Sequence, residues 1–315
     1  MIGAVDIGGT KIAAGLVDTR GQIIARQVVP TDRDKDFETA LGHIHRMLTD
    51  CMERHPERKL IGIGVGCTGP IDPETGVLGP KSFLPLWEGS PTLPRLEETF
   101  KLPVAMENDA DAAALGEVAW GAGQGALRCV YVTVSTGIGC GMILDGRVYR
   151  GAGGAHPELG HVIIDPSLGP ACYCGGRGCW ESLASGTALA DWYSGEIIRR
   201  GLPDRRGLPA GSPVDAWAVC SLAEQGDALA QEAVVREGYY LGIGLANLIT
   251  TFVPDVIVLG GGVMESWRLF EGQVWATIRQ TCGLVPYERT HLRLASLGSR
   301  TGLAGAGQVL FHRFG

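Results

Sequence analysis

Short apolar segments separated by turn residues open the chain and predict a strand meander. Residues 2–7, 12–17 and 22–29 are rich in Val, Ile and Ala, and two of these are typical strand formers. The sequence Asp18-Thr19-Arg20-Gly21 is a turn signal between the second and third segments, and Gly8-Gly9 marks a corner after the first. We therefore expect three consecutive strands with a glycine corner between the first two.

Helical spacing follows this meander. From residue 36 onward, apolar residues recur three or four positions apart as far as residue 51, which predicts an amphipathic helix. The apolar run 60–65 has the length of a buried strand, so a crossover into a parallel strand is expected. A short strand at 104–106 then runs through residues 107–109 into an alanine-rich helix that ends near Trp120.

The second half of the chain repeats the opening pattern. Segments 130–135, 139–144 and 147–150 resemble strands separated by a glycine corner and by an Asp-Gly hairpin signal. Asp6-Ile7-Gly8-Gly9-Thr10 corresponds in this comparison to Ser135-Thr136-Gly137-Ile138-Gly139. The repeat predicts two related α/β domains facing one another.

The remaining pattern is mainly helical. It predicts helices at 181–200, at 228–252 and up to about residue 280, strands at 256–259 and near Leu292, and a last helix at 302–311 that returns to the first domain. We place the smaller domain at residues 1–119 together with the C-terminal helix of about 301–315. The larger domain then spans residues 120–300.

Composition and charge exclude several classes of protein. Glycine occupies 48 of 315 positions but shows no three-residue period, which excludes collagen-like and disordered chains. The net charge is −7 without any Lys/Arg run, so a surface for nucleic acid or anionic membrane is disfavoured. No apolar run reaches the ~20 residues of a bilayer helix, and no signal peptide is visible. We expect a cytoplasmic protein with neither a nucleic-acid nor a membrane partner.

Three cysteines stand close together at Cys172, Cys174 and Cys179. Glycines between them permit the tight turns that let three thiolates converge on one ion at about 2.3 Å. A tetrahedral site needs a fourth ligand, and His161 is the nearest histidine apart from His156. Three unligated thiols and a redox pair are the alternatives, although the usual Cys-x-x-Cys spacing is absent. The pattern favours a structural zinc ion.

The two glycine corners are candidate phosphate sites, because backbone N–H groups can approach an anion closely there. Gly8-Gly9 and Gly137-Ile138-Gly139 each stand beside a hydroxyl residue, Thr10 and Thr136 respectively. Their pairing favours a nucleotide, and the alternative is that both are merely tight hairpins. The Walker phosphate-loop sequence is absent from the chain.

A dinucleotide fingerprint also occurs, at Gly64, Gly66 and Gly69. Prolines follow it at positions 70 and 73, where the dinucleotide-binding fold needs a helix to begin. We therefore interpret this match as false, and the loop as the lining of a cleft.

Asn108-Asp109 stands where a strand ends and a helix begins, the place where α/β sheets present catalytic groups. Asp109 is a candidate general base, while an N-cap is the alternative role for this pair. Glu107 and Asp111 are interpreted equally well as ordinary surface charges. Carboxylates at Glu158 and Glu181 flank the cysteine loop and suit hydrogen bonds from a polyhydroxylated ligand.

Taken together, these motifs resemble the ROK family of bacterial sugar kinases and sugar-responsive repressors over essentially the whole chain. Residues 5–11 resemble its first phosphate motif, 136–139 its second, and 260–262 its loop beside the adenosine. Glu158-Leu159-Gly160-His161, followed by Cys172-x-Cys174 and Gly178-Cys179-x-Glu181, resembles its zinc signature. The resemblance implies an actin-like fold, that is, two ribonuclease-H-like α/β domains with nucleotide and sugar in the cleft between them.

The resemblance also implies a role for each matching residue. Asp109 is the expected base, and the expected sugar contacts are Asn108, Asp109, Glu158, His161, Glu181 and Gly69. The expected nucleotide and Mg²⁺ contacts are Asp6, Gly8, Gly9, Thr10, Lys11, Thr136, Gly137, Gly139, Gly260, Gly261 and Gly262. The expected zinc ligands are His161, Cys172, Cys174 and Cys179.

The implied activity is that of an ATP-dependent, glucokinase-like hexose kinase acting on the 6-hydroxyl, with ATP, Mg²⁺ and a structural Zn²⁺, in a homodimer or homotetramer. His156-Pro157 resembles the family's fructokinases, whereas the Cys-x-Cys loop resembles its glucokinases and N-acylhexosamine kinases. Cys67-Thr68-Gly69-Pro70 departs from the usual Pro-Gly-Pro, so the sugar remains open among hexoses. A sugar-sensing repressor of the same family is disfavoured, because it needs a DNA-reading domain ahead of the first strand, and that strand begins here at residue 2. A non-catalytic sugar-sensing regulator that lacks its own DNA domain is a further alternative. A zinc hydrolase is excluded if all four coordination positions are filled.

Overall fold

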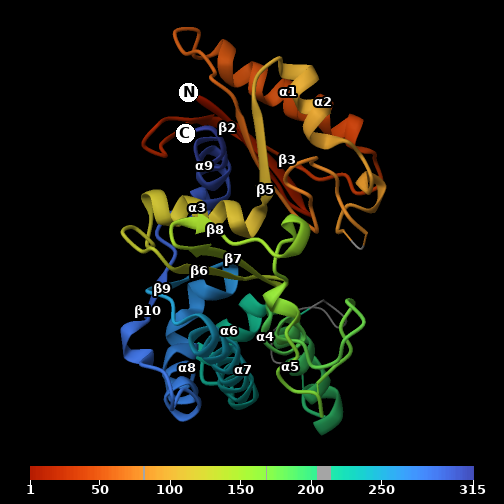
Figure 1. The fold of residues 1–315 in the computed structure, drawn as a ribbon. Helices are drawn as coiled ribbons and strands as arrows, with labels where there is room; N and C mark the ends of the chain where they lie inside the picture. The colour runs from red at the N-terminus through yellow and green to blue at the C-terminus, as the bar shows by residue number, and fades with distance from the viewer. Residues whose placement is uncertain (81, 168, 204–213) are drawn as a thin grey trace. The chain divides into compact units, whose positions relative to one another are not determined.

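The structure is a computed structural model that describes residues 1–80, 82–167, 169–203 and 214–315. Two five-stranded sheets and their helices make up the described chain (Figure 1). The strands are β1 (Ile2–Ile7), β2 (Lys11–Val17), β3 (Ile23–Pro30), β4 (Ile63–Cys67), β5 (Val104–Asn108), β6 (Cys129–Val134), β7 (Ile138–Leu144), β8 (Arg147–Val148), β9 (Val256–Gly260) and β10 (His291–Leu294). The α-helices are α1 (Phe37–Glu53), α2 (Thr92–Phe100), α3 (Asp109–Trp120), α4 (Trp180–Ala184), α5 (Gly186–Arg200), α6 (Ala216–Glu224), α7 (Ala228–Phe252), α8 (Trp267–Thr281) and α9 (Thr301–Phe314).

The chain forms two compact units. Unit 1 contains Met1–Tyr131, Gly141–Pro157 and Arg293–Gly315, and unit 2 contains Val132–Cys140 and Glu158–Leu292. These units are groups of mutually contacting residues. The domain division expected from the sequence stays a prediction.

Strand order confirms the internal repeat. The first sheet has the order β3-β2-β1-β4-β5, and the second has β8-β7-β6-β9-β10. Each sheet therefore begins with a meander of three strands and adds two later strands beside the first of them. The repeat recognised at Asp6–Thr10 and Ser135–Gly139 corresponds to equivalent turns, because β1–β2 and β6–β7 hold the same places in their sheets.

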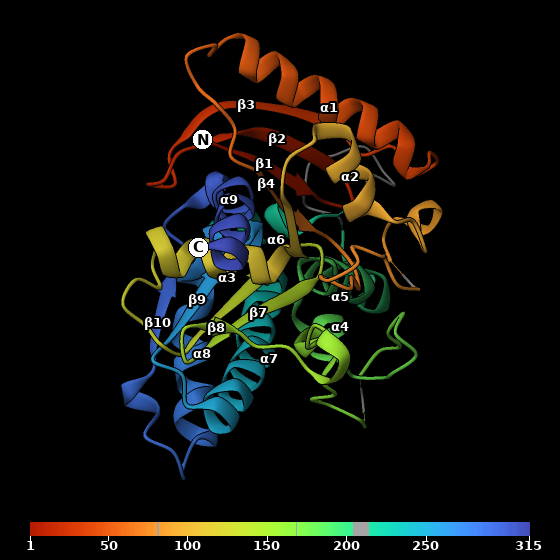
Figure 2. The same ribbon diagram turned by 45° about the horizontal axis from the view of Figure 1, so that its top comes forward.

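Residue alternation along the first sheet separates its two faces. Val5 and Ile7 pack with α1 residues such as Leu41, while Ala4 and Ala13 pack with α9. Helices α1 and α2 accordingly cover one face, and α9 with α3 covers the other (Figure 2). The predicted apolar face of α1 is confirmed, and the Asp36 carboxylate caps this helix by accepting from the Thr39 N–H at 3.0 Å.

Small residues allow α9 to lie directly on the sheet. A Cβ at Gly64 would stand 1.8 Å from the Ala306 carbonyl oxygen of α9, and one at Gly305 would stand 2.3 Å from the Ala112 oxygen of α3. Among the described residues after Gly69, the first helix is the short 3-10 helix Pro85–Trp87 and α2 follows it, so no helix begins where the dinucleotide-binding fold needs one and the match is false, as expected. Packing of α9 on β4 explains the first glycine of that false fingerprint.

The buried carboxylate of Glu117 fixes the start of α9. It accepts hydrogen bonds from the backbone N–H groups of Ala122 at 2.7 Å, Ser296 at 3.2 Å and Leu297 at 3.1 Å. The Thr301 hydroxyl donates to the same carboxylate at 3.4 Å. The first turn of α9 consequently lies beside Asp6. A Cβ added at Gly302 in this turn would stand only 2.1 Å from an Asp6 carboxylate oxygen.

Some elements differ from the sequence predictions. The single helix expected at 181–200 is two helices, because Ser185 is extended and its hydroxyl caps α5 by accepting from the Ala188 N–H at 3.2 Å. Helices α2 and α6 were not predicted, and α2 carries Pro94 in its first turn, where no amide donor is needed. The bounds of α7 agree with the predicted 228–252. Among the described residues, no helix combines the length and the apolar character needed to cross a bilayer.

Helix α7 buries a carboxyl group. Glu237 is fully buried, and neither of its carboxyl oxygens has a hydrogen-bond partner among the described residues. Burial raises the pKa of this carboxyl well above its usual range, and the neighbouring Arg236 opposes that shift. A carboxyl with a raised folded-state pKa stabilises the fold below its unfolded pKa, and this contribution is lost as pH rises through the folded pKa.

We predict that Glu237→Leu increases the free energy of unfolding by about 1–3 kcal/mol at pH 8, because an unsatisfied buried polar group is removed. The gain should be smaller at pH 5, because lowering the pH favours the neutral form of the wild-type carboxyl, whose pKa is raised in the folded state. Calorimetric unfolding at both pH values measures the difference. Glu271→Leu, at an exposed position of α8, is the control and should show no such pH-dependent gain. A gain that does not grow with pH would contradict the buried-acid interpretation.

Candidate active site

In unit 1, parallel pairing brings the predicted site residues to one sheet edge. Strand β4 pairs in parallel with both β1 and β5, with Ile7, Cys67 and Asn108 in register. The carboxyl ends of these strands carry Asp6, the loop of Gly69, and the Asn108-Asp109 pair. Asp6, Gly69, Asn108 and Asp109 therefore lie at the carboxyl ends of neighbouring parallel strands, which is the usual position of ligand sites in α/β sheets.

Asn108 combines a structural role with its candidate function. Its side-chain oxygen caps α3 by accepting from the Ala110 N–H at 2.8 Å, so the N-cap interpretation is confirmed for this residue. Its amide nitrogen donates to the Gly69 carbonyl at 3.4 Å, which ties the cap to the loop after β4. Asp109 is the first residue of α3, and its carboxylate also accepts from the Ala110 N–H, at 2.9 Å.

Negative charge concentrates around Asp6. The pKa of Asp6 rises from 3.8 to about 6, mainly through burial and then through the nearby Asp109 carboxylate. Lys11 and Arg26 lower this pKa but do not cancel the rise. The buried Cys67 thiol also has a raised pKa, through burial first and then through both carboxylates. The Asp6 and Asp109 side chains therefore interact electrostatically within this unit.

The first glycine corner is a closed turn. The Gly8 N–H donates to the Lys11 carbonyl at 2.9 Å, and the Thr31 hydroxyl donates to the Gly8 carbonyl at 2.7 Å. Thr10 and Lys11 are exposed beside Gly9. The turn thus presents a hydroxyl and an ammonium group to solvent near the strand end that carries Asp6.

In unit 2, the second glycine corner is the point on which several site segments converge. The Ser135 N–H donates to the Gly137 carbonyl at 2.9 Å, which closes the turn between β6 and β7 that contains Thr136 and precedes Gly139. The Glu181 carboxylate accepts from the Ile138 N–H at 2.9 Å. A Cβ at Gly160 would stand 2.1 Å from the Ile138 carbonyl oxygen. The turn therefore contacts both Glu181 and the Glu158–His161 segment.

Burial raises the pKa of the Glu181 carboxyl, and the Glu158 carboxylate raises it further. The hydrogen bond from Ile138 and the neighbouring His161 act in the opposite direction. Glu158 is exposed, and it precedes the short 3-10 helix Leu159–His161. Glu158, His161 and Glu181 are thus grouped by the structure.

The glycine-rich loop after β9 lies against the end of β6. Gly260 ends β9, Gly261 has φ +90°, and Gly262 begins the 3-10 helix Gly262–Ser266. A Cβ at Gly261 would stand 2.2 Å from the Val134 carbonyl oxygen. The two predicted nucleotide segments of unit 2 are therefore adjacent.

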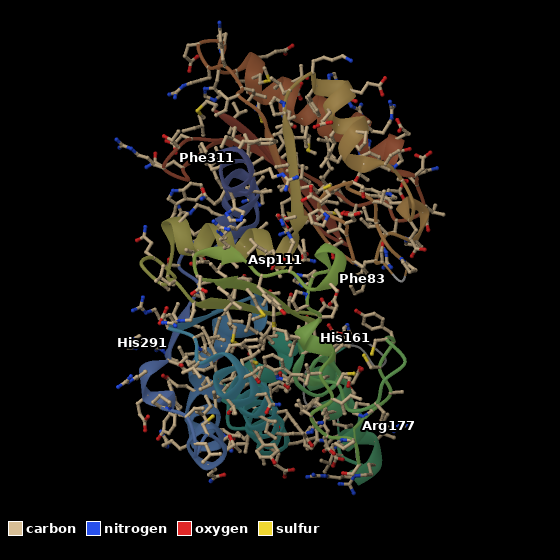
Figure 3. The ribbon with its side chains drawn as sticks, viewed as in Figure 1. Phe83, Asp111, His161, Arg177, His291 and Phe311 are labelled. Atoms are coloured by element: carbon tan, nitrogen blue, oxygen red, sulfur yellow. The ribbon has the colours of Figure 1, made fainter. Side chains whose placement is uncertain are left out.

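A Cys/His cluster stands beside this group. His161, Cys172, Cys174 and Cys179 offer ligand atoms that all lie within 4.8 Å of one another. His161 Nδ1 is 3.4 Å from the Cys172 sulfur, and the sulfurs of Cys174 and Cys179 are 3.6 Å apart. Gly175 and Gly178 make the tight turns with positive φ, and the Arg177 guanidinium donates to the Gly169 carbonyl at 2.9 Å (Figure 3). The cluster could hold a metal ion.

Tyr173 is a neighbour that sequence reasoning missed. Its hydroxyl is 3.0 Å from His161 Nε2, and the two rings meet edge to face with centroids 5.0 Å apart. Burial and the carboxylates of Glu181 and Glu158 raise the pKa of Tyr173. The only available signal was its position between two of the clustered cysteines.

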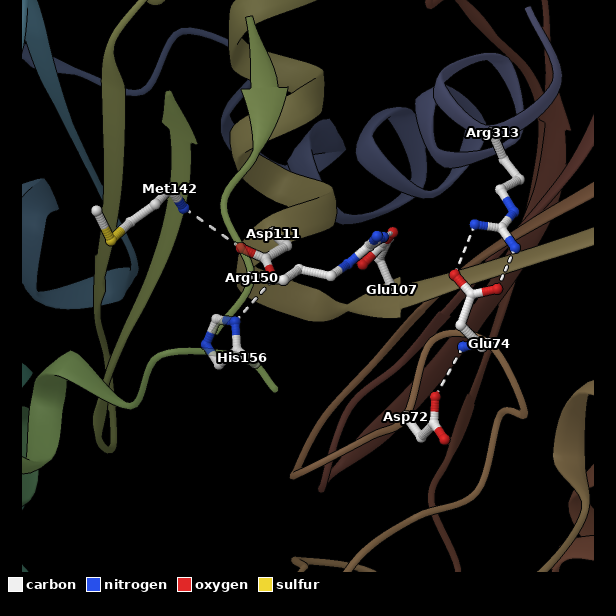
Figure 4. A network of polar contacts seen from close by, with 8 residues as sticks. All are labelled: Asp72, Glu74, Glu107, Asp111, Met142, Arg150, His156 and Arg313. Atoms are coloured by element: carbon white, nitrogen blue, oxygen red, sulfur yellow. Dashed lines mark hydrogen bonds and ion pairs between the residues drawn. The ribbon is translucent and has the colours of Figure 1, made fainter. Parts of the chain in front are cut away.

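Glu107 and Asp111 are not surface charges, so that interpretation of the sequence was wrong. Their exposed fractions are 5% and 1%, and each is paired, Glu107 with Arg150 and Asp111 with His156 (Figure 4). Their partners are more than forty residues away in the sequence, so no local pattern could reveal the pairing.

Comparisons with known proteins agree over the whole chain. A model of the ROK family matches residues 2–313. The glucokinase of Halalkalibacterium halodurans is 33% identical over 314 residues, covering 97% of this chain and 93% of that protein. Xylose repressors are also among the relatives.

Solved structures give the same result. The ROK hexokinase from Thermus thermophilus matches with a TM-score of 0.81 and 37% identity, covering 100% of this chain and 99% of that one. A ROK family glucokinase from Streptomyces griseus, in complex with glucose and AMPPNP, matches with a TM-score of 0.81 and 31% identity, covering 98% of each chain. The expected actin-like α/β fold is confirmed. The chain belongs to the ROK family.

Proposed function

We propose that this protein is an ATP-dependent hexose kinase that phosphorylates the 6-hydroxyl of glucose or a similar hexose. The observation that carries the proposal is the Asp109 carboxylate, held at the start of α3 beside Asp6 at the carboxyl ends of parallel strands. Full-length similarity to a glucokinase solved with glucose and AMPPNP supports it. Hexose-dependent ADP release across a panel of hexoses is the test.

Asp109 acts as the general base in this proposal. Its carboxylate accepts the proton of the sugar hydroxyl while the sugar oxygen bonds to the γ-phosphorus and the bond to the ADP oxygen breaks. Asn108 and Gly69 contact the sugar in the same unit. In unit 2, Glu158, His161 and Glu181 accept or donate hydrogen bonds to sugar hydroxyls.

Nucleotide binding is assigned to the glycine turns. Gly8, Gly9, Thr10 and Lys11 hold phosphate oxygens in unit 1, and the corresponding residues of unit 2 are Thr136, Gly137, Gly139, Gly260, Gly261 and Gly262. Asp6 would hold Mg²⁺ through water, and its environment fits a cation because two carboxylates raise the local negative charge. When bound, Mg²⁺ neutralises charge on the transferred phosphate.

Zinc fits the Cys/His cluster. Three thiolates and one imidazole form a usual tetrahedral donor set, and ligand atoms within 4.8 Å of one another can surround one ion. His161 Nδ1 lies 3.4 Å from the Cys172 sulfur, so with zinc bound Nε2 would carry the proton and would donate it to the Tyr173 hydroxyl, 3.0 Å away, or to a sugar hydroxyl. With all four positions filled, the ion has a structural role, which is to hold the Glu158–His161 segment and Glu181 together.

We further propose a cytoplasmic homodimer or homotetramer. N-acylhexosamine kinase and fructokinase activities are alternatives that the hexose panel would distinguish. A non-catalytic sugar-sensing regulator is the alternative from another class, supported by the xylose repressors among the relatives. Absence of ATP turnover with every hexose, despite hexose binding, would favour the regulator.

Replacing the base should separate chemistry from binding. We predict that Asp109→Asn lowers kcat by about 10²–10⁴-fold while glucose still binds, because only the proton acceptor is lost. Asparagine can still accept from the Ala110 N–H, so the start of α3 is preserved. Turnover is measured by ADP release and glucose binding by calorimetry, with Asp191→Asn, an exposed site on α5, as the control. Unchanged kcat in the Asp109 variant would refute its role.

Removing one cysteine should affect zinc and sugar together. Cys174→Ser is expected to lose bound zinc and to raise the KM for hexose at least tenfold, because the ion orients the proposed sugar contacts. Elemental analysis gives the metal content, and Cys220→Ser, a buried cysteine outside the cluster, is the control. Full zinc stoichiometry in the Cys174 variant would count against this ligand set.

A side chain at Gly262 should interfere with ATP alone. A Cβ there meets nothing within 4 Å among the described residues, and Gly262 does not have positive φ, so the fold should accept valine. We expect Gly262→Val to raise the KM for ATP severalfold with little change in the KM for glucose, because it blocks nucleotide approach. Gly272→Val on α8, also in open space, is the control. Equal KM values for ATP in the two variants would remove this loop from the nucleotide site.

A further inference from the structure

Two pairs of polar side chains flank Asp109 symmetrically in the sequence. Glu107, two residues before it, pairs with Arg150, and Asp111, two residues after it, pairs with His156 at 2.7 Å (Figure 4). All five residues belong to unit 1. The proposed base therefore stands on a five-residue stretch that is held at both ends.

Burial makes these pairs strong constraints. The exposed fractions are 6% for the Glu107 side chain and 25% for its partner Arg150, and 2% for Asp111 and 7% for His156. Breaking either pair is unfavourable because it leaves a buried carboxylate without its partner. The second oxygen of Asp111 accepts from the Met142 N–H at 3.3 Å, which also fastens α3 to β7.

Both partners come from one short segment, residues 150–156. The Gly151 N–H donates to the Ala155 carbonyl at 2.7 Å, which closes a loop between the two partner residues. Gly153 and Gly154 have positive φ within that loop. Closing the loop couples Arg150 to His156, so the two pairs act on the Glu107–Asp111 stretch as one clamp. Two residues after His156 the chain reaches Glu158, a proposed sugar contact.

We propose that Arg150 and His156 are positioning residues that hold the Asp109 carboxylate in place through Glu107 and Asp111. This inference rests on the proposed kinase function and adds residues to it. Neither pair needs to touch a substrate, because displacing a catalytic group by about 1 Å can cost on the order of 10²-fold in rate.

The same region contains a matched ion pair that does not flank Asp109. Arg313 pairs with Glu74, and both line the same hollow of about 180 Å³ as Glu107 and Arg150. The exposed fractions of their side chains are 44% and 55%, so this pair is solvated. Removing the Arg313–Glu74 pair changes the charge in the same hollow but leaves both contacts of the Glu107–Asp111 stretch in place.

The test compares disruptive and conservative variants. Arg150→Met and His156→Ala should lower kcat by about 10–100-fold and change the KM for ATP less than twofold. Arg150→Lys and His156→Gln retain a hydrogen-bond donor, so each should have a kcat at least fivefold higher than the disruptive variant at the same position. Arg313→Met should stay within twofold of wild type. Full kcat in a folded Arg150→Met or His156→Ala protein would overturn the proposal.

Two further measurements separate positioning from loss of stability. Amide hydrogen exchange of the peptide containing residues 107–111 should be faster in both disruptive variants and unchanged in Arg313→Met. The kcat of the double variant Glu107→Gln with Arg150→Met should be no lower than that of Arg150→Met alone, because both changes break the same Glu107–Arg150 pair. Two results would contradict the proposal that the pairs act through residues 107–111. One is unchanged hydrogen exchange of this peptide in the disruptive variants, and the other is a double variant whose kcat is lower than that of Arg150→Met.

The turnover of the wild-type protein keeps the kinase hypothesis and the clamp hypothesis apart. Wild-type protein that releases no ADP with any hexose would refute the proposed kinase function. Wild-type turnover combined with insensitive disruptive variants would refute only the clamp. If Arg150→Met does not fold, the kcat and exchange of His156→Ala, compared with those of Arg313→Met, decide between the two outcomes.

Discussion

The register of three parallel strands determines where the chemistry of unit 1 is located. Ile7, Cys67 and Asn108 stand side by side across β1, β4 and β5, and the loops that follow carry the remaining site residues. A shift of one residue would turn each side chain to the opposite face of the sheet. Asp6 would then leave the vicinity of Asp109 and the first turn of α9. The raised pKa of Asp6 is a direct consequence of this register, because it reflects burial beside a second carboxylate.

Very close helix packing covers these strands. Gly64 and Gly305 have backbone neighbours so near that any side chain would collide with them, so α9 can lie on β4 and against α3 only because these positions lack a Cβ. Glu117 then fixes where α9 begins, and Gly302 brings that first turn against Asp6. Gly64, the first glycine of the sequence that resembles a nucleotide fingerprint, therefore serves helix packing in the structure. A motif match needs its structural context, here a following helix, before it indicates a ligand.

Local signals predicted the fold well, and long-range contacts limited what the sequence could reveal. The bounds of α7, the apolar face of α1 and the repeated strand order follow from periodicity and turn residues close in sequence. The cysteine cluster was equally accessible, because three of its members lie within eight residues. The burial of Glu107 and Asp111 could not be predicted from the sequence, because it depends on their distant partners Arg150 and His156. The break at Ser185 depends on one hydroxyl replacing a helical hydrogen bond, which hydrophobic spacing does not record.

The glycines of the proposed nucleotide turns can be ranked by whether the fold alone requires them. Gly137 leaves room for the Glu181 carboxylate, and Gly261 needs positive φ as well as space beside Val134. The fold alone therefore requires glycine at position 261, where the neighbouring atoms are backbone, whereas at position 137 the neighbouring atoms belong to the Glu181 side chain. Gly262 is different, since no described atom lies within 4 Å of an added Cβ there and its backbone suits other residues. Packing gives no reason for its small size, so its role in the proposed site depends on a ligand. Among these three glycines, Gly262 therefore carries the most information about function.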